Sequence, residues 1–452
     1  MNREVNIEVK KKIELSKRPY KGTRDLFPSD KRIQEYLFQK MRETALLFGY
    51  EPYDGPLLEE VELYKAKSGE ELINEQIYSF TDRGDRLVAI RPEMTPTLAR
   101  MVSQIYKEAA RPLRWYAIPN LMRYEKPQKG RLREHWQFNC DIFGAPSSVG
   151  ELEILSVSVH LLKNFGATEN DFEILINDRH IVDDVFKKKF KLSSEQIYRL
   201  YKIIDRAKKV PSDTLDAMMT ELMLEPDSKK GLYDYLEIKN FTDLFTFLDI
   251  LNLSTTKEYF QNFTNKISAF NLDKYITYDP TIVRGLDYYT GVVFEIYDKH
   301  PDNRRALCGG GAYANLLEIF NEEPLPGVGF GLGDVTLKDF LSSHNLLPDF
   351  TKPDNDLYLT FQSEEGEQSA WNLATTLRQH GVKVTLALAP IKFNKAIPLA
   401  TRCGARYVGF LAETEISENA VTLKNLKNSE QLKISITNIS NILDFITSKD
   451  ID

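Results

Sequence analysis

A predicted hairpin between residues 122 and 144 carries side chains whose types and spacing could do chemistry. Arg123 ends its first strand, and Arg131 follows a Pro-Gln-Lys-Gly turn, so the hairpin has a basic tip. A basic tip alone is most often simply solvated. The second strand places polar side chains on one face and apolar ones on the other: Gln137, Asn139 and Asp141 against Trp136, Phe138 and Cys140. Because an inward sheet face should be apolar, this polar row predicts a binding site.

A second segment whose residues could do chemistry runs from residue 283 to residue 298 and has the sequence VRGLDYYTGVVFEIYD. Its two tyrosines, Tyr288 and Tyr289, would by themselves indicate half-buried packing. Arg284 and Asp287 stand close beside them. These charged neighbours favour a ligand site over simple packing.

The composition limits the kind of protein that could hold such a site. The 452 residues carry a formal net charge of −7, with 42% hydrophobic and 28% charged residues, which is typical of a folded protein with two or three domains. The acidic balance argues against non-specific coating of nucleic acid, but it allows RNA binding through local basic patches. No stretch approaches the roughly 20 apolar residues of a membrane span, so we expect a cytoplasmic protein without a membrane partner.

Cysteines and histidines indicate neither a disulfide framework nor a metal site. The three cysteines lie far apart and form no Cys-x-x-Cys pair, and the six histidines show no metal-ligand spacing. We therefore expect reduced thiols, and any metal should arrive with a substrate. The sequence also lacks a Gly-x-x-x-x-Gly-Lys-Ser/Thr loop, and the glycines from Gly309 onward lack the strand and helix context of a dinucleotide site.

The hydrophobic spacing predicts an α+β fold that would position these segments. Helices are expected over residues 29–48 and 148–165. Several short segments are typical of strands, among them QIYSF, RLVAI, LRWYAI, DFEILI and GVGFGL. An antiparallel sheet is the expected core.

Two changes of pattern divide the chain into expected domains. Residues 179–276 lose the strand signals and predict a helical insertion, which separates residues 1–178 from residues 277–352 of one sheet domain. A stretch with two prolines then leads into residues 353–452. Their alternation of strands and helices predicts a small α/β domain with a mostly parallel sheet.

The hairpin resembles motif 2 of class II aminoacyl-tRNA synthetases. Its segment RYEKPQKGR, followed by Gln137 and Asp141, resembles the histidyl-tRNA synthetase family in particular. Other segments are similar to that family in the expected order: KGTRDLFP, FGYEPYDGPLLE with Pro56 in the place of the motif 1 proline, and RPEMTPTLAR. The segment that begins at Val283 is similar to the family's histidine-specific motif. The resemblance covers nearly the whole chain and is weakest in its last hundred residues.

This resemblance implies a class II catalytic domain in residues 1–178 and 277–352, interrupted by the helical insertion, and an anticodon-binding domain in residues 353–452. It implies a histidine–tRNA ligase, which activates L-histidine with ATP and Mg²⁺ and transfers it to the 3′ end of tRNA(His). The motif 1 proline implies a homodimer.

The implied chemistry needs fixed cations. When a carboxylate attacks the α-phosphorus of ATP, negative charge gathers on one phosphate. By resemblance, Arg123 holds the α-phosphate and the amino acid carboxylate, Arg131 reaches the distal phosphates, and Arg284 acts in the transition state. Glu125 belongs to the implied ATP site. Arginine suits these places because its planar fork stays charged and engages two oxygens at once.

The resemblance also implies a histidine pocket. Asp141 and Tyr289 would contact the imidazole, with Tyr288 beside them. Three residues would bind the ammonium group: Glu93, Thr95 and Gln137. Met94, between the first two in the sequence, also belongs to the implied histidine site. Because a buried unpaired donor costs about 1–3 kcal/mol, two polar contacts would reject apolar isosteres of histidine.

Two places depart from the family pattern. The third motif usually ends in Glu-Arg, and its arginine clamps the γ-phosphate, but GVGFGLGDVTL has Gly333 and Asp334 there. GGGAYANL has Ala312 and Ala314 where Arg and Asp are common. We expect one correlated rearrangement of the distal phosphate pocket, with Asp334 facing Mg²⁺ or another cation.

These departures leave two other hypotheses open. One is a paralogue without aminoacylation activity, which senses histidine as the regulatory subunit of an ATP phosphoribosyltransferase. Such paralogues tend to lack the anticodon-binding domain and the motif 2 arginines, and the sequence indicates both here. The other is an RNA-binding protein built on the same domains, in which Glu93, Gln137 and Asp141 would have no purpose.

Overall fold

The computed structural model describes residues 15–66, 72–283 and 288–447. The chain divides into two compact units. Unit 1 lies within Met1–Asp25 and Gln34–Leu347, and unit 2 lies within Leu26–Ile33 and Pro348–Asp452. No helix in the described ranges has the length and apolar character needed to cross a bilayer.

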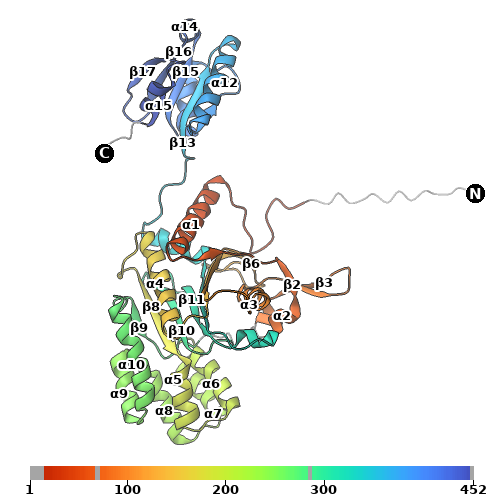
Figure 1. Ribbon diagram of the computed structural model, residues 1–452, viewed down its shortest axis with the longest axis vertical. Coiled ribbons are helices and arrows are strands. Elements are labelled where there is room, and N and C mark those ends of the chain that lie inside the picture. Colours follow the sequence, from red (N-terminus) through yellow and green to blue (C-terminus); the bar gives the residue numbers. More distant parts are fainter. Residues whose placement is uncertain (1–14, 67–71, 284–287, 448–452) are drawn as a thin grey trace, which may run out of the picture. The chain divides into compact units, whose positions relative to one another are not determined.

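Unit 1 is organised around a sheet in the order β1-β5-β7-β12-β11-β10-β8-β9, with β6 also paired to β7 (Figure 1). The neighbouring pairs from β5 to β8 are antiparallel, whereas the outer pairs β1–β5 and β8–β9 are parallel. The expected antiparallel core is therefore confirmed. Its strands have these bounds: β1 Glu51–Pro52, β5 Leu113–Ala117, β6 Asn120–Met122, β7 Glu134–Phe143, β8 Phe172–Asp178, β9 Ile276–Tyr278, β10 Val292–Asp298, β11 Ala306–Tyr313 and β12 Gly327–Gly333.

Three longer helices accompany the sheet: α1 (Pro28–Leu47), α4 (Val149–Asn164) and α11 (Asp334–Ser343). Helix α4 packs on β7 and β12, and α11 packs on β7, β11 and β12. The first two helices confirm the expected helices at 29–48 and 148–165. They also contact each other, since the Tyr36 ring of α1 meets Phe165 edge-on at 5.7 Å between centroids.

A small three-stranded antiparallel sheet, in the order β2-β4-β3, lies beside the central one. Short helices surround it, and α3 contacts both α2 and the 3-10 helix η3. The bounds of these elements are β2 Leu58–Glu60, α2 Val61–Lys65, the π-helical η1 Leu72–Gln76, β3 Tyr78–Thr81, β4 Leu87–Ile90, α3 Thr95–Gln104 and η3 Leu316–Phe320.

The glycines of β12 leave room for the polar face of β7. Gly329 pairs with Asp141, and a Cβ atom on Gly329 would lie 2.0 Å from Asp141 Oδ1. A Cβ on Gly331 would lie 2.6 Å from the Gln137 side chain. These distances are shorter than van der Waals contact, so only glycine admits the carboxylate and the amide across this strand.

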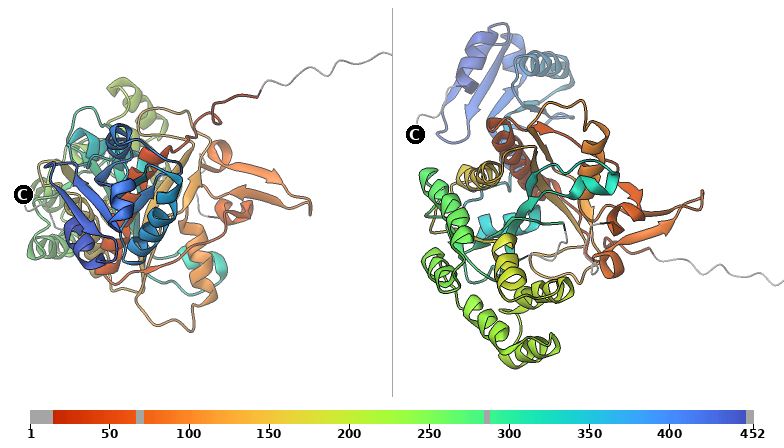
Figure 2. Two further views of the ribbon diagram at one scale, coloured as in Figure 1. Left: turned by 90° about the horizontal axis from the view of Figure 1, so that it is seen from above. Right: turned by 60° about the horizontal axis from the view of Figure 1, so that its bottom comes forward.

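The helical insertion connects β8 to β9, and its helices gather at one end of the central sheet (Figure 2). It is fixed there by a buried network, because the hydroxyls of Tyr235 and Tyr278 lie 2.9 Å apart and both donate to Asn177 Oδ1. The expected loss of strands after β8 is confirmed. Its elements are α5 Arg179–Val182, the π-helical η2 Asp183–Lys189, α6 Ser194–Arg206, α7 Ser212–Glu221, α8 Pro226–Leu236, α9 Phe241–Ile250 and α10 Ser254–Ala269.

Unit 2 holds a five-stranded sheet in the order β14-β13-β15-β16-β17. Strands β14, β13 and β15 are parallel, but β15–β16 and β16–β17 are antiparallel, so the prediction of a mostly parallel sheet is wrong for half of the pairings. The sequence did not predict strand β17, because only Ile434 in it is buried and one buried residue gives no alternating pattern. The bounds are β13 Asn355–Phe361, α12 Glu364–Gln379, β14 Val384–Leu386, α13 Phe393–Arg402, β15 Ala405–Leu411, α14 Glu413–Ser417, β16 Ala420–Asn425, β17 Gln431–Ser435 and α15 Ile439–Thr447.

The glycine strand yields a test of packing. Gly329→Ala should lower the free energy of unfolding of unit 1 by about 1–3 kcal/mol, since the new methyl group overlaps the Asp141 carboxylate. Gly333→Ala is the matched control, because its Cβ would meet only Thr336 Oγ1 at 3.5 Å, and it should cost under about 1 kcal/mol. Urea unfolding followed by circular dichroism measures both. Equal stability of the two variants would contradict the packing argument.

Candidate active site

A cavity of about 1390 Å³ opens in unit 1 over the polar face of β7. Most of the residues expected at the site line it: Glu93, Thr95, Arg123, Arg131, Gln137, Asp141, Tyr288 and Tyr289. They come from segments up to about 200 positions apart, which the antiparallel order β7-β12-β11-β10 brings together. The alternation on β7 is as expected, because Phe138 and Cys140 are fully buried on the opposite face.

Two other expected residues are placed differently, and a third is not described. Met94 is buried with its sulfur 3.9 Å from Arg91 Nη1 and does not line the cavity. Glu125 is buried too, and its carboxylate forms an ion pair with Arg131. Arg284 lies outside the described residues.

Asp141 is a carboxylate buried at one end of the cavity, with 4% of the residue exposed. Its Oδ1 accepts a hydrogen bond from the Tyr313 hydroxyl. Burial raises the pKa of Asp141 to about 7, although the bond from Tyr313 acts in the opposite direction. At neutral pH the group is therefore close to its titration midpoint and is sensitive to any donor that enters the cavity.

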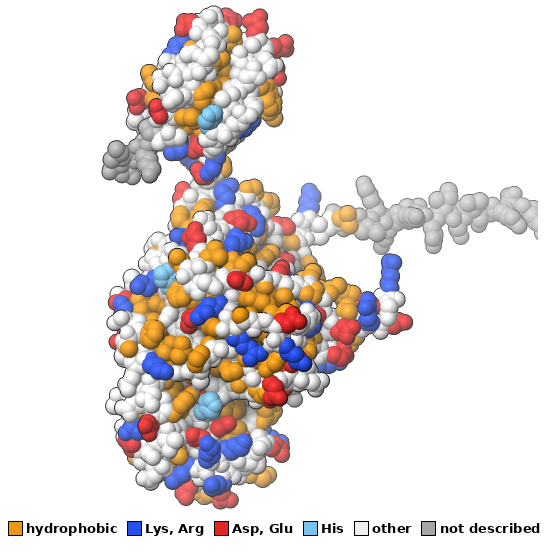
Figure 3. Space-filling view, viewed as in Figure 1, with side chains coloured by type: hydrophobic (Ala, Val, Ile, Leu, Met, Phe, Trp, Pro, Cys, Tyr) orange, Lys and Arg blue, Asp and Glu red, His pale blue; other side chains and the backbone are white. Residues whose placement is uncertain are grey.

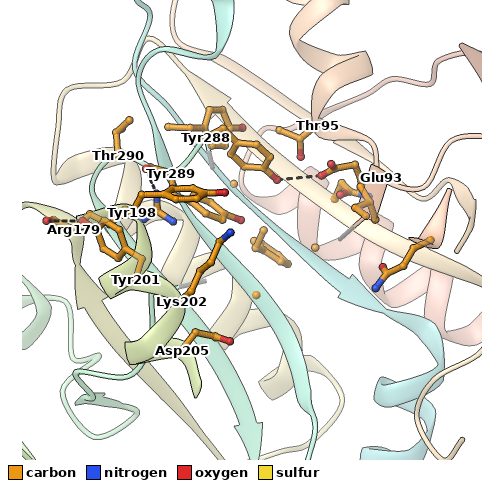
Figure 4. A pocket seen from close by; sticks show the side chains of 18 of the residues that line it. Glu93, Thr95, Arg179, Tyr198, Tyr201, Lys202, Asp205, Tyr288, Tyr289 and Thr290 are labelled. Atoms are coloured by element: carbon orange, nitrogen blue, oxygen red, sulfur yellow. Dashed lines mark hydrogen bonds between the residues drawn. The ribbon is translucent and has the colours of Figure 1, made fainter. Parts of the chain in front are cut away.

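Glu93 forms a second acidic position, and the Tyr288 hydroxyl donates to its Oε2 at 3.2 Å (Figure 4). The rings of Tyr288 and Tyr289 lie 4.8 Å apart between centroids. A Cβ on Gly311 would come within 2.7 Å of Tyr289, so β11 also provides a glycine where a site residue crosses it. The cavity wall here combines two carboxylates with two phenols.

The sequence did not predict a role for Arg179, although this residue hydrogen-bonds the backbone of the tyrosine segment. Its Nη1 donates to Tyr289 O at 2.8 Å, and its Nη2 donates to Val283 O at 3.0 Å. The bonded partners lie more than 100 positions along the chain from Arg179. An arginine directly after the Asn-Asp end of β8 was the only local signal.

The other end of the cavity is strongly positive. Burial, together with the nearby charges of Arg123, Arg24 and Arg131, lowers the pKa of His135 to about 3. His135 is therefore neutral. Arg123 is oriented by a bond from its Nε to Pro92 O at 2.8 Å. Converging guanidinium groups of this kind favour an anionic ligand.

Asp334 does face a cation, and that cation is Arg24 of the N-terminal segment. The two side chains form an ion pair, and Asp334 Oδ1 also accepts from the Trp136 backbone N–H at 3.0 Å. Burial raises the pKa of Asp334, and Arg24 lowers it in part. The departure in the third motif is thus matched by a partner 310 positions earlier in the chain.

The insertion contributes one wall of the cavity, which the sequence did not reveal. Helix α6 presents aromatic and charged side chains to it: Tyr198, Tyr201, Lys202, Asp205 and Arg206 (Figure 4). The Lys202 ammonium lies 4.3 Å from the Tyr198 ring centroid, and Arg179 lies 4.8 Å from the Tyr201 ring centroid. This mixed surface borders the tyrosine end of the site.

Comparisons with known proteins agree with this geometry. A family model described as histidyl-tRNA synthetase matches residues 22–336, and a model of the anticodon binding domain matches residues 356–445. A histidine–tRNA ligase of Leptospira biflexa is 42% identical over 94% of this chain and 97% of its own. The chloroplastic/mitochondrial histidine–tRNA ligase of Arabidopsis thaliana is 35% identical over 95% of this chain and 87% of its own.

Solved structures agree in fold. A histidyl-tRNA synthetase from Nostoc sp. PCC 7120 gives a TM-score of 0.80 at 22% identity, covering 97% of this chain and all of that one. A Bacillus halodurans protein titled ATP phosphoribosyltransferase regulatory subunit/histidyl-tRNA synthetase gives 0.74 at 21% identity, covering 88% of this chain and 99% of its own.

Unit 1 contains the antiparallel catalytic domain of a class II aminoacyl-tRNA synthetase, and an anticodon-binding domain follows it in the chain. Such an enzyme binds ATP, an amino acid and a tRNA. The chain belongs to the histidyl-tRNA synthetase family, whose activity is the ligation of histidine to tRNA.

The elevated pKa of Asp141 predicts a pH dependence. Below about pH 7 this carboxyl holds a proton, and above it the carboxylate is free to accept a bond from an imidazole N–H. The dissociation constant of histidine should therefore fall as the pH rises from 6 to 8. Asp141→Asn should bind histidine about tenfold or more weakly at pH 8, because a charge-assisted bond is lost.

Calorimetric titration at several pH values measures this effect. The imidazole of free histidine also titrates in this range, and its titration in solution is the same in both experiments. Asp249→Asn, an exposed change in α9, is the control. If Asp141→Asn kept the full pH dependence of the wild type, Asp141 would not be the group that titrates.

Proposed function

We propose that unit 1 joins L-histidine to ATP as histidyl-adenylate in the cavity over β7, and that the histidyl group then passes to the 3′ end of tRNA(His). The observation that carries this proposal is the polarity of the cavity. Two buried carboxylates lie at one end, and the guanidinium groups of Arg123 and Arg131 lie at the other, where burial and these charges lower the pKa of His135. A zwitterionic amino acid beside a polyphosphate matches that separation of charge.

Four residues take part in the proposed first step. The carboxylate of histidine attacks the α-phosphorus, the bond to the bridging oxygen breaks, and pyrophosphate leaves. Arg123 holds the attacking carboxylate against the α-phosphate, and Arg284 stabilises the charge of the transition state. Arg131, held by Glu125, contacts the nucleotide. Mg²⁺ arrives with the phosphates of ATP, whose oxygens are the ligands it prefers.

The acidic end of the cavity selects histidine. Asp141 accepts a bond from one imidazole nitrogen, and Tyr289 contacts the ring, with Tyr288 beside it. The ammonium group is bound by polar side chains, those of Glu93, Thr95 and Gln137. Buried Met94 supports the segment that carries Glu93 and Thr95. Because Asp141 would lose its imidazole partner if an apolar side chain entered, the pocket discriminates by leaving this buried group unpaired.

The proposal extends to the organisation of the chain. Residues 1–178 and 277–352 form the catalytic domain, residues 179–276 the insertion, and residues 353–452 the domain that reads the anticodon. Unpaired anticodon bases suit such a domain, since proteins read single strands more readily than the deep groove of A-form RNA. A reducing cytoplasm suits the three free cysteines.

A homodimer is also part of the proposal. Pro56, in the place of the motif 1 proline, borders a second hollow with Leu63 and Phe320. Nearby apolar side chains are exposed, including Leu57 and Leu58 of the chain leading into β2. Figure 3 shows hydrophobic side chains gathered over this part of unit 1. An exposed apolar surface of this kind would be covered in a two-fold dimer.

Histidine-dependent exchange of labelled pyrophosphate into ATP tests the activity directly. The full chain should catalyse exchange with histidine and not with other amino acids, and it should charge tRNA(His). Histidine binding without exchange above background would favour the regulatory paralogue of an ATP phosphoribosyltransferase. RNA binding without histidine binding would favour the third hypothesis.

Arg284→Ala should reduce pyrophosphate exchange at least about a hundredfold, because its proposed contact stabilises the transition state. Binding of histidine at equilibrium should stay within roughly tenfold of the wild type. Arg83→Ala, an exposed residue between β3 and β4, provides the control. Unchanged exchange in Arg284→Ala would remove this assignment.

A further inference from the structure

The first turn of α11 brings no cation to the phosphate end of the cavity. Its sequence is Asp-Val-Thr-Leu from Asp334 onward. Asp334 forms an ion pair with Arg24. The Thr336 hydroxyl lies 3.2 Å from the carbonyl oxygens of both Leu307 and Gly333. The first turn of α11 therefore offers the distal phosphates of a nucleotide no cation.

The tip of the motif 2 loop points to that element. Gly130, at the tip, has a φ of +72°, and a Cβ built there lies 3.3 Å from Arg305 Cδ and 3.5 Å from Thr336 Cγ2. Lys129 Nζ donates to Asp302 O at 3.4 Å. The loop tip therefore lies against the turn before β11, including the aliphatic stem of Arg305, and against the start of α11.

The cations already described at this end are engaged. Arg131, which follows Gly130 and lines the cavity, is paired with Glu125. Arg123 donates to a backbone carbonyl, and His135 is neutral. Arg305 is half-buried, and its guanidinium makes no hydrogen bond or ion pair within the ranges that the structure describes. Asp339 approaches the same loop tip, with Oδ2 3.9 Å from the built Cβ, but forms no such bond there with Arg305.

We propose that Arg305, at the start of β11, binds the β- and γ-phosphates of ATP in place of a cation on α11. This rests on the proposed use of ATP in the same cavity. Arginine suits the position because its planar fork engages two phosphate oxygens. The loop tip at Gly130 lies against its stem, while β11, which begins at the next residue, continues to Gly309 in the cavity wall. The anionic Asp334 is tolerated beside the phosphates because Arg24 neutralises it.

The test compares ligands that have or lack the distal phosphates. Arg305→Ala should raise the KM for ATP in the exchange reaction, and the dissociation constant of ATP, about tenfold or more. A sulfamoyl analogue of histidyl-adenylate, which has no β- or γ-phosphate, should bind within about twofold of the wild type. Arg305→Lys should be intermediate, because it keeps the charge and loses the fork.

Arg304→Ala is the matched control, since it removes the adjacent, exposed arginine, and it should leave both affinities within about twofold. The inference is overturned if Arg305→Ala leaves ATP affinity unchanged, or if it weakens ATP and the adenylate analogue equally. Failure of the proposed function would look different, because the wild type itself would then show no histidine-dependent exchange. Calorimetric ATP binding would still test Arg305 in that case.

Discussion

The buried carboxylate of Asp141 is the interaction on which the rest of the site depends. An acidic group with 4% exposure must be compensated, and Tyr313 provides only one hydrogen bond to it. The sheet can hold this group only because β12 has glycine opposite it, where a methyl would overlap the carboxylate oxygen. The glycine alternation of the third motif is therefore a steric consequence of the polar row on β7.

The same sheet separates charge along the cavity. Carboxylates and phenols occupy one end, and guanidinium groups surround a neutral His135 at the other. Under the proposed function, this separation favours one orientation of the ligands, with the ammonium group and imidazole of histidine at one side and the phosphates of ATP at the other. This orientation brings the carboxylate of the amino acid toward the α-phosphate, which is the geometry that adenylate formation needs.

The local spacing of polar and apolar residues predicted many of the strands and helices that form the site. The features that it did not predict depend on contacts between residues far apart in the sequence. The period of two on β7 showed which of its side chains share a face, and helical spacing located α1 and α4. Arg179 had no such signal, because its partner Tyr289 lies 110 positions away in the sequence. The pair of Arg24 and Asp334 had none either, because these two residues are 310 positions apart. The walls that α6 adds depend on how the insertion docks through Tyr235, which no local period encodes. In unit 2, β17 was missed because one buried side chain makes no alternation.

A crystal structure with histidine and a non-hydrolysable ATP analogue bound tests the central assignment most directly. The imidazole should lie within hydrogen-bonding distance of the Asp141 carboxylate, with the α-phosphate beside Arg123. Phosphates at the Asp141 end, or histidine bound outside the cavity over β7, would contradict it.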